Sequence, residues 1–319
     1  MMDTYKITFL SKSCINDLPN SQTIFGAICN ILLQTKSEEA LQEYLNSLND
    51  NPQFVHSSMF LNHTFPMIKK KIFQLDSLNE LISNLPAEMK LDALANAKKF
   101  KSISLMSDKI FESYILNGKI DQLSKDIQYK MNQFHIDKKS LEFKDEDVFP
   151  DSSFILLTRN GFPVDNNKTL FYSKAYYYPE NTEFCIYLKT SHSKEEIKEI
   201  FQYFEYFGIG NRRSIGSNVF ILKDIEKVKF DNNSDYRLLL SRYIPQENEV
   251  NYNQSYYELE SDIYRTSKDY AGGYVSGKYV HMCEGSLLRL NEEKSFYGKV
   301  IKTSVNDKDV YHYGLGFVV

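Results

Sequence analysis

The chain has 319 residues, of which 42% are hydrophobic and 25% are charged, and its formal net charge is −4 at pH 7. A chain of this length can bury a substantial core, and we expect two domains rather than one. The net charge argues against a protein that coats nucleic acid indiscriminately, but it allows a local basic site, because binding depends on the patch more than on the sum.

The cysteines and the N-terminus indicate a cytoplasmic protein that has no membrane contact. The cysteines lie far apart and form no CxxC pair, which is typical of free thiols in a reducing compartment. The segment MMDTYKITFL lacks a basic stretch followed by an apolar one, so we expect no signal peptide. The apolar stretch from Ile24 to Leu33 is too short to span a bilayer. The cysteines are Cys14, Cys29, Cys185 and Cys283.

The first part of the chain reads as a strand followed by two helices. Alternating apolar residues in YKITFL predict a strand over residues 5–10. The segment SQTIFGAICNILL predicts a helix over 21–33 that Ser21 or Thr23 can cap. SEEALQEYLNSL predicts a second helix over 37–48, whereas residues 50 to 150 are irregular with short helical pieces.

The middle of the chain reads as a hairpin, a strand, a helix and another strand. Two strand-like runs flank the turn pair Asn160-Gly161, which predicts a long hairpin over 154–178 with Gly161 at a projecting tip. A strand over 183–189 follows. Ser193 and Glu196 then form a capping box that begins a helix ending at Gly208, and a strand starts at VFIL.

This order of elements predicts an α+β fold. The βαββαβ order with a large insertion is that of a ferredoxin-like (RRM-like) unit. After Phe230 the pattern restarts with a shorter, β-rich part, which we interpret as a second ferredoxin-like unit. We therefore expect one domain over 1–230, with an inserted protruding hairpin over about 141–180, and a smaller domain over 231–319.

The segment GIGNRRSIGSNVF, residues 208–220, is the most unusual stretch. A helix C-cap explains Gly208 alone. Glycines also let backbone N–H groups approach an anionic oxygen closely, and arginines add bidentate phosphate contacts. The segment is not a P-loop, because it lacks GxxxxGK[ST] and follows a helix rather than opening one. From spacing alone, a turn and a phosphate site remain equally open.

The segment FQYFEYFGIGNRRSIGSNVF resembles the glycine-rich loop of the RAMP superfamily of CRISPR proteins. Within that superfamily it is similar to the family of the fourth subunit of type III-A (Csm) effector complexes, which is Cas-five-like. Asn218 stands where the family's pattern has its last glycine, and Asn tolerates left-handed backbone better than most residues. The matching positions are Gly208, Gly210, Arg212, Arg213, Ser214, Gly216 and Phe220.

Three further stretches carry the resemblance along the chain. SQTIFGAICNILL is similar to the family's Asp-Thr-Leu-Phe-x-Ala helix, with Gln22 in place of the acid. FPMIKKKIF and KKFKSISLMS resemble its Pro-Lys-Pro segment, without the second proline, and the basic stretch after it. SGKYVHMCEGSLL is similar to its C-terminal motif, with Lys278 and the Glu-Gly-Ser segment 284–286 in place.

The resemblance implies a non-catalytic RNA-binding scaffold for antiviral defence, without a cofactor or a metal. Family members hold the 5′ handle of the guide RNA and bridge the large polymerase-palm subunit to a backbone RAMP subunit. Their protruding hairpin, the thumb, wedges into the duplex of guide and target RNA. The residues expected to bind RNA are Gly208, Gly210, Asn211, Arg212, Arg213, Ser214, Gly216, Ser217, Asn218, Lys98, Lys99, Lys101 and Lys278.

Two other functions stay open at this stage. Metal-independent RNases of the same superfamily process guide RNA with histidine as general acid or base, and His192 is the one candidate here. A protein-interaction module whose glycine loop is only a turn is the other alternative. The histidines contain no HxxxH or His-Asp pair, so we do not expect a metal site. They are His56, His63, His135, His192, His281 and His312.

Overall fold

A central antiparallel sheet brings together strands from both ends of the first 230 residues. The structure is a computed structural model that describes residues 2–71, 83, 90, 102–137, 139–160, 170–210, 213–265 and 275–319. The sheet has the order β11-β1-β10-β2, and β3 also pairs with β10. Its strands are β1 Asp3–Ser11, β2 Phe54–His56, β3 Phe60–Leu61, β10 Glu183–Thr190 and β11 Phe220–Lys227.

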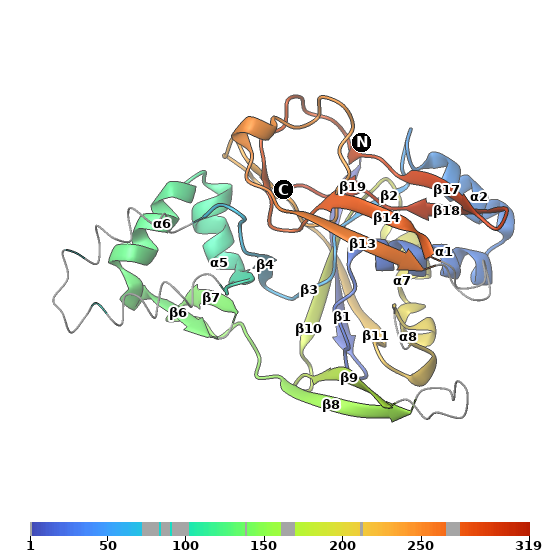
Figure 1. Ribbon diagram of the computed structural model, residues 1–319, viewed down its shortest axis with the longest axis horizontal. Helices are drawn as coiled ribbons and strands as arrows, with labels where there is room; N and C mark the ends of the chain where they lie inside the picture. The colour runs from blue at the N-terminus through green and yellow to red at the C-terminus, as the bar shows by residue number, and fades with distance from the viewer. Residues whose placement is uncertain are drawn as a thin grey trace.

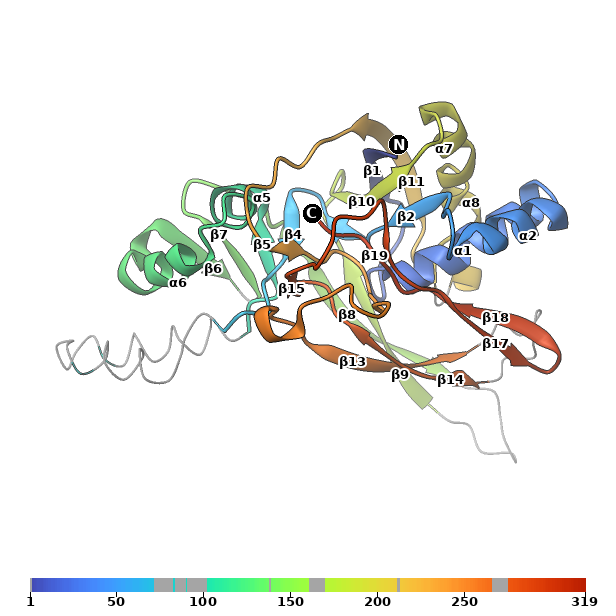
Figure 2. The same ribbon diagram turned by 90° about the horizontal axis from the view of Figure 1, so that it is seen from above.

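Helices cover one face of this sheet, as Figures 1 and 2 show. From β1, the ring of Phe9 packs against Phe201 and Phe204, with ring centroids 6.4 and 5.6 Å away. Successive side chains of a strand point to opposite faces, so this contact fixes which face of β1 meets the helices. The helices are α1 Ser21–Thr35, α2 Glu38–Ser47, α7 Lys194–Phe201 and α8 Phe204–Phe207.

The insertion after β3 covers part of the other face. Phe65 stacks on Phe111 within the insertion, at 3.9 Å, and on Tyr187 of β10, at 5.7 Å. Strand β10 is therefore buried on both faces, which explains its nearly continuous apolar sequence. The elements of the insertion are β4 Thr64–Pro66, β5 Leu105–Ser107, α5 Asp108–Ile110, a π-helical segment Phe111–Leu116, α6 Ile120–Tyr129, β6 Phe134–Asp137 and β7 Ser140–Phe143.

The long hairpin predicted from the sequence is confirmed. Strand β8 Ser153–Asn160 pairs antiparallel with β9 Leu170–Tyr177 over their whole length, and the pair projects from the end of the sheet (Figure 1). Ser173 and Ala175 are buried and mark the face that packs on the body of the protein. The predicted turn at Gly161 lies outside the described residues.

The part after residue 230 is β-rich, as predicted, and its described strands form four separate antiparallel pairs. Leu238, Leu287 and Phe317 from this part join the same cluster of buried side chains as Ile7 of β1. A domain boundary near residue 230 and a second ferredoxin-like unit stay predictions. The strands are β12 Arg237–Leu238, β13 Leu259–Arg265, β14 Val275–Met282, β15 Leu287–Leu288, β16 Tyr297–Gly298, β17 Ile301–Val305, β18 Lys308–His312 and β19 Leu315–Gly316.

Two helix boundaries differ from the prediction. Asn20 caps α1, because its side chain accepts the N–H of Thr23, whereas the sequence suggested Ser21 or Thr23 as the cap. The helix that begins at the capping box of Ser193 breaks after α7, and the shorter α8 completes the path to Gly208. Among the described helices, none is long and apolar enough to cross a membrane.

We expect Gly285→Ala to destabilise the fold much more than Gly216→Ala. Both glycines have positive φ, +89° and +80°, which costs an alanine roughly 1–2 kcal/mol. A Cβ on Gly285 would also lie 2.2 Å from the carbonyl oxygen of Met67, whereas a Cβ on Gly216 meets nothing within 4 Å. Overpacking of this kind adds about 1–3 kcal/mol. Urea unfolding measures both free energies, and equal losses would contradict the close approach at Gly285.

Candidate nucleic-acid interface

The backbone of the glycine-rich loop has a positive φ at four positions. Gly208 ends α8 with φ of 62°, and Gly210, Gly216 and Asn218 have φ of 79°, 80° and 55°. A positive φ strains most residues but not glycine, and asparagine tolerates it better than most. This explains why these four positions hold three glycines and one asparagine. Asn218 takes this conformation at the place where the resembled pattern has a glycine.

The end of the loop is fastened to the segment that follows β1. The N–H of Asn218 donates to the carbonyl of Cys14 at 3.0 Å, and the N–H of Asn16 donates to the Asn218 side chain at 2.9 Å. Ser217 lies 3.5 Å from the thiol of Cys14. Ser217 and Asn218 are only 2% and 3% exposed, so these side chains, expected to bind RNA, face the interior.

The start of the loop packs against the N-terminus of α1. A Cβ on Gly210 would lie 2.8 Å from the methyl group of Thr23, so only glycine allows this approach. Gln22, which replaces an acid of the resembled motif, accepts the N–H of Tyr313 at 2.5 Å and donates to the carbonyl of Tyr311 at 3.3 Å. This glutamine therefore ties α1 to the C-terminal part of the chain.

The loop and the first turn of α1 form part of the wall of a cavity of about 540 Å³. The cavity brings together three motifs that lie far apart in the sequence: the first helix, the glycine loop and the Glu-Gly-Ser segment. Its lining residues are Asn16, Asp17, Leu18, Pro19, Asn20, Thr23, Ser58, Met59, Phe60, Leu105, Gly210, Asn218, Arg242 and Glu284.

Buried hydrogen bonds hold the far wall of this cavity. The N–H of Ser21 donates to the hydroxyl of Ser58 at 2.9 Å, and that hydroxyl donates to the carboxylate of Glu284. The carbonyl of Gly285 accepts the N–H of Lys69 at 2.9 Å. The Glu-Gly-Ser segment is thus part of the contact between the C-terminal part and the first part of the chain.

The remaining residues expected to bind RNA lie apart from the cavity or outside the described residues. Arg213 is exposed in a 3₁₀ turn, Arg213–Ile215, whose backbone includes Ser214. The N–H of Gly216 already donates to the carbonyl of Arg213 at 3.0 Å. Lys278 is exposed on β14 and does not line the cavity. Asn211, Arg212, Lys98, Lys99 and Lys101 lie outside the described residues.

The sequence analysis missed several of the polar residues that line the cavity. Asn16 and Asp17 precede α1, Ser58 follows β2, and Arg242 lies in the C-terminal part. The Arg242 guanidinium forms an ion pair with Asp262. None of these residues stands in a recognisable motif, since only the packing of distant segments brings them together.

His192, the one candidate for acid–base catalysis, has the contacts of a residue at a helix start. Its Nδ1 lies 3.2 Å from the carboxylate of Glu196, and its ring packs on Phe54 with centroids 5.0 Å apart. The backbone N–H of Ser193 is the main cause that lowers the pKa of Glu196 to about 2. His192 does not line the cavity.

Comparison with known proteins gives solved structures of similar fold. No protein-family model and no curated protein matches the chain. A chain in the crystal structure of the Csm3–Csm4 subcomplex of the type III-A CRISPR-Cas interference complex is 18% identical, with a TM-score of 0.63 and 98% of both chains covered.

Chains in two crystal structures of a Csm1–Csm4 cassette, one in complex with pppApA and one with cA4, are also similar. Both are 16% identical, with TM-scores of 0.57 and 0.56, and the match covers 99% of this chain and 97% of theirs. At these identities the likeness is one of fold, and it extends over the whole chain. The resemblance predicted from the glycine loop and the Glu-Gly-Ser segment is confirmed at that level.

We expect Asn218→Ala to be less stable than Asn218→Gly, and both to be less stable than the unchanged protein. Either substitution leaves the buried N–H of Asn16 without its acceptor, which costs about 1–3 kcal/mol. Alanine adds roughly 1–2 kcal/mol for its left-handed backbone. Chemical denaturation measures the three free energies of unfolding.

The matched control for this prediction is Asn248→Gly. Asn248 also has a positive φ, 62°, but it is exposed. Its replacement by glycine should change the free energy of unfolding by only a few tenths of a kcal/mol. If Asn218→Gly were as neutral as this control, the bond between Asn16 and Asn218 would not stabilise the loop.

Proposed function

We propose that the chain is a non-catalytic RNA-binding scaffold subunit of a type III-A CRISPR effector complex, where it holds the 5′ handle of the guide RNA. The observation that carries this proposal is the likeness of fold over 98% of the chain to a chain of the Csm3–Csm4 structure. Csm4 is also named in the Csm1–Csm4 structures, so it is the subunit common to all three matches.

The expected fold and partners follow from this proposal. The order β1, α1, β2, β10, α7, β11 supports a ferredoxin-like unit in residues 1–230, with residues 231–319 as a smaller second domain. The partners would be a large polymerase-palm subunit and a backbone RAMP subunit, besides the guide and target RNA. The complex would act in the cytoplasm.

Three features in and beside the glycine loop support a phosphate site there. Its ends at Gly210 and Asn218 are packed against α1 and against the segment after β1, while Arg213 between them is exposed. The N-terminus of α1 carries partial positive charge, and its first turn contains no acidic residue. Arginine offers the paired N–H donors that match phosphate oxygens.

The hairpin of β8 and β9 is suited to contact bases of a guide–target duplex. Its outward face carries Phe154, Leu156 and Tyr172, which are 50%, 54% and 71% exposed. These residues lie on alternate positions of two paired strands, so their side chains share one face. Aromatic side chains stack on bases without regard to sequence, which is what a thumb acting on many guides requires.

Replacing Arg212 and Arg213 together by alanine should weaken binding of handle RNA and reduce its dependence on salt. Removal of one phosphate-binding side chain lowers the slope of log affinity against log salt by roughly 0.7 when the RNA is single-stranded. Titrations of the purified chain with handle RNA at several salt concentrations measure this slope. The control is Arg289→Ala, which removes an arginine ion-paired with Asp235 outside the cavity.

The two variants separate a phosphate site from a general charge effect. An unchanged slope in the double variant, or the same loss in Arg289→Ala, would contradict a phosphate site at the glycine loop. In the same samples, repeat RNA incubated with and without EDTA should be recovered intact. Cleavage at one phosphodiester would instead favour a guide-processing endoribonuclease.

Tyr172→Ala should weaken engagement of target RNA by the assembled complex and leave the melting temperature unchanged. The side chain is exposed, so it adds little to stability, and loss of one base–aromatic stack costs about 1–3 kcal/mol. The control is Tyr252→Ala, an exposed tyrosine of the C-terminal part. A large fall in melting temperature for Tyr172→Ala, with unchanged RNA engagement, would indicate that the hairpin face is structural.

A further inference from the structure

Three potential metal ligands meet at the base of the ribbon formed by β13 and β14. Glu260 of β13 stands directly opposite His281 of β14, and Cys283 follows two residues later. Because side chains alternate along a strand, His281 and Cys283 point to the same face, and Glu260 shares it as the cross-strand neighbour. The N–H of Cys283 donates to the carbonyl of Glu258 at 3.1 Å, which extends the ladder past β14.

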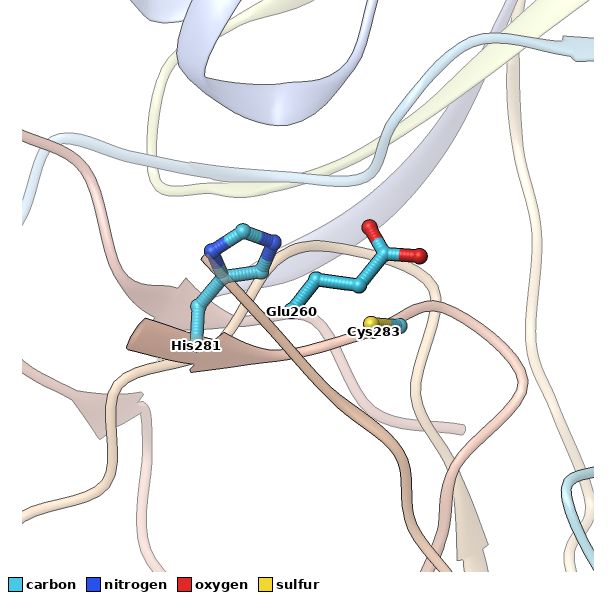
Figure 3. A group of neighbouring side chains, drawn as sticks. All are labelled: Glu260, His281 and Cys283. Atoms are coloured by element: carbon cyan, nitrogen blue, oxygen red, sulfur yellow. The ribbon is translucent and has the colours of Figure 1, made fainter. Parts of the chain in front are cut away.

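The ligand atoms of these three residues lie within 4.8 Å of one another. Figure 3 shows the imidazole of His281 and the carboxylate of Glu260 on the same side of the ribbon, with Cys283 beside them. His281 and Cys283 are each 4% exposed, whereas Glu260 is exposed and leaves a path from solvent.

The imidazole of His281 has a buried nitrogen that the surrounding protein does not satisfy. Its Nε2 has no hydrogen-bond partner among the described residues. A buried polar atom without a partner costs free energy and calls for a ligand or a water. A metal ion bound between His281, Cys283 and Glu260 would use this nitrogen as a ligand.

We propose that Glu260, His281 and Cys283 bind a divalent transition-metal ion, and that Zn²⁺ fits them best. Zinc takes thiolate, imidazole and carboxylate ligands, and sites with three protein ligands leave a fourth position for water. Magnesium and calcium prefer oxygen ligands alone, so a buried thiol and imidazole disfavour them.

The charges around the three ligands also suit a cation. Glu284 follows Cys283 directly in the sequence. Glu258 lies two residues before Glu260 and forms an ion pair with Lys69. Lys69 and Arg242 are nearby positive groups that would oppose a cation, and each is ion-paired with a carboxylate, Lys69 with Glu258 and Arg242 with Asp262. The neighbourhood therefore keeps negative charge in excess.

The site adjoins the cavity of the candidate RNA interface. Glu284 and Arg242 both line that cavity, and Glu284 is the residue next to the proposed ligand Cys283. A bound ion would fix the base of the ribbon and thereby the position of the Glu284 carboxylate. The inference does not depend on the proposed RNA function, because the three ligands come from the C-terminal part alone.

The test is a titration of the full-length, tag-free chain with Zn²⁺ and with Co²⁺ after treatment with a chelator. We expect one ion per chain, and the Co²⁺ form should show the charge-transfer absorption of a thiolate ligand. Cys283→Ser should abolish that absorption. His281→Gln and Glu260→Gln should each weaken binding by more than the roughly 10- to 100-fold that loss of an outer-shell partner costs.

Two control variants and a melting curve complete the experiment. Cys14→Ser and His192→Gln each remove a potential ligand that is not part of the cluster, and they should bind the ion like the unchanged chain. The exposed Glu260→Gln separates lost binding from lost folding, because an exposed substitution should leave the melting temperature of the metal-free chain unchanged.

No binding by the unchanged chain, or equal binding by all three ligand variants, would overturn the metal site. In that case the Nε2 of His281 is satisfied by a water. If the unchanged chain binds handle RNA but no metal, the metal site is wrong and the proposed function stands. If it binds metal but no RNA, the proposed function is wrong and the metal site stands.

Discussion

The first turn of α1 is a buried polar junction on which the arrangement of the whole chain depends. Ser21 is fully buried, donates its N–H to Ser58 and accepts the N–H of Arg242 at 3.0 Å with its hydroxyl. Ser58 in turn donates to Glu284. Buried polar groups are costly unless each has its partner, so the loss of one of these bonds would weaken the others. They fix the first helix, the segment after β2 and the C-terminal part relative to one another.

The cavity beside the glycine loop is a consequence of that junction. Because the junction satisfies Ser21, the N-terminus of α1 can face the cavity next to Gly210 instead of being covered by another element. The loop is fastened by Asn218 at one end and packed against Thr23 at the other. A ligand bound there would not have to order the ends of the loop, which lowers the entropic cost of binding.

Local signals in the sequence were enough to predict many elements but not the contacts between them. The capping box of Ser193 and Glu196, the alternation in β1 and the paired runs around Asn160 each depend on neighbouring residues, and each prediction is confirmed. The predicted cap of α1 was wrong, because Asn20, Ser21 and Thr23 are all residue types that cap helices well. Only the buried hydrogen bonds of Ser21 decide among them.

The cavity and the cluster of Glu260, His281 and Cys283 could not be predicted in this way, because their members are brought together only by the fold. Arg242 meets Ser21 across 221 residues of sequence. The expectation of no metal site rested on the absence of HxxxH and of a His-Asp pair. It did not consider His281 and Cys283, whose neighbour Glu260 lies on the adjacent strand, and it stays a prediction that the proposed metal site opposes. Strand register, rather than sequence spacing, decides such a cluster.

The charges of the chain limit how it could hold RNA in the proposed function. The net charge is −4, and the charged groups that line the cavity are Asp17, Glu284 and Arg242, with Arg242 already paired. Attraction by a broad positive field is therefore weak here, and the proposed phosphate binding would have to rely on the N-terminus of α1 and on an exposed arginine such as Arg213. Under the proposed function, such a site would hold a short, ordered stretch of RNA at fixed positions, as a 5′ handle requires, and the rest of the RNA would need the surfaces of other subunits.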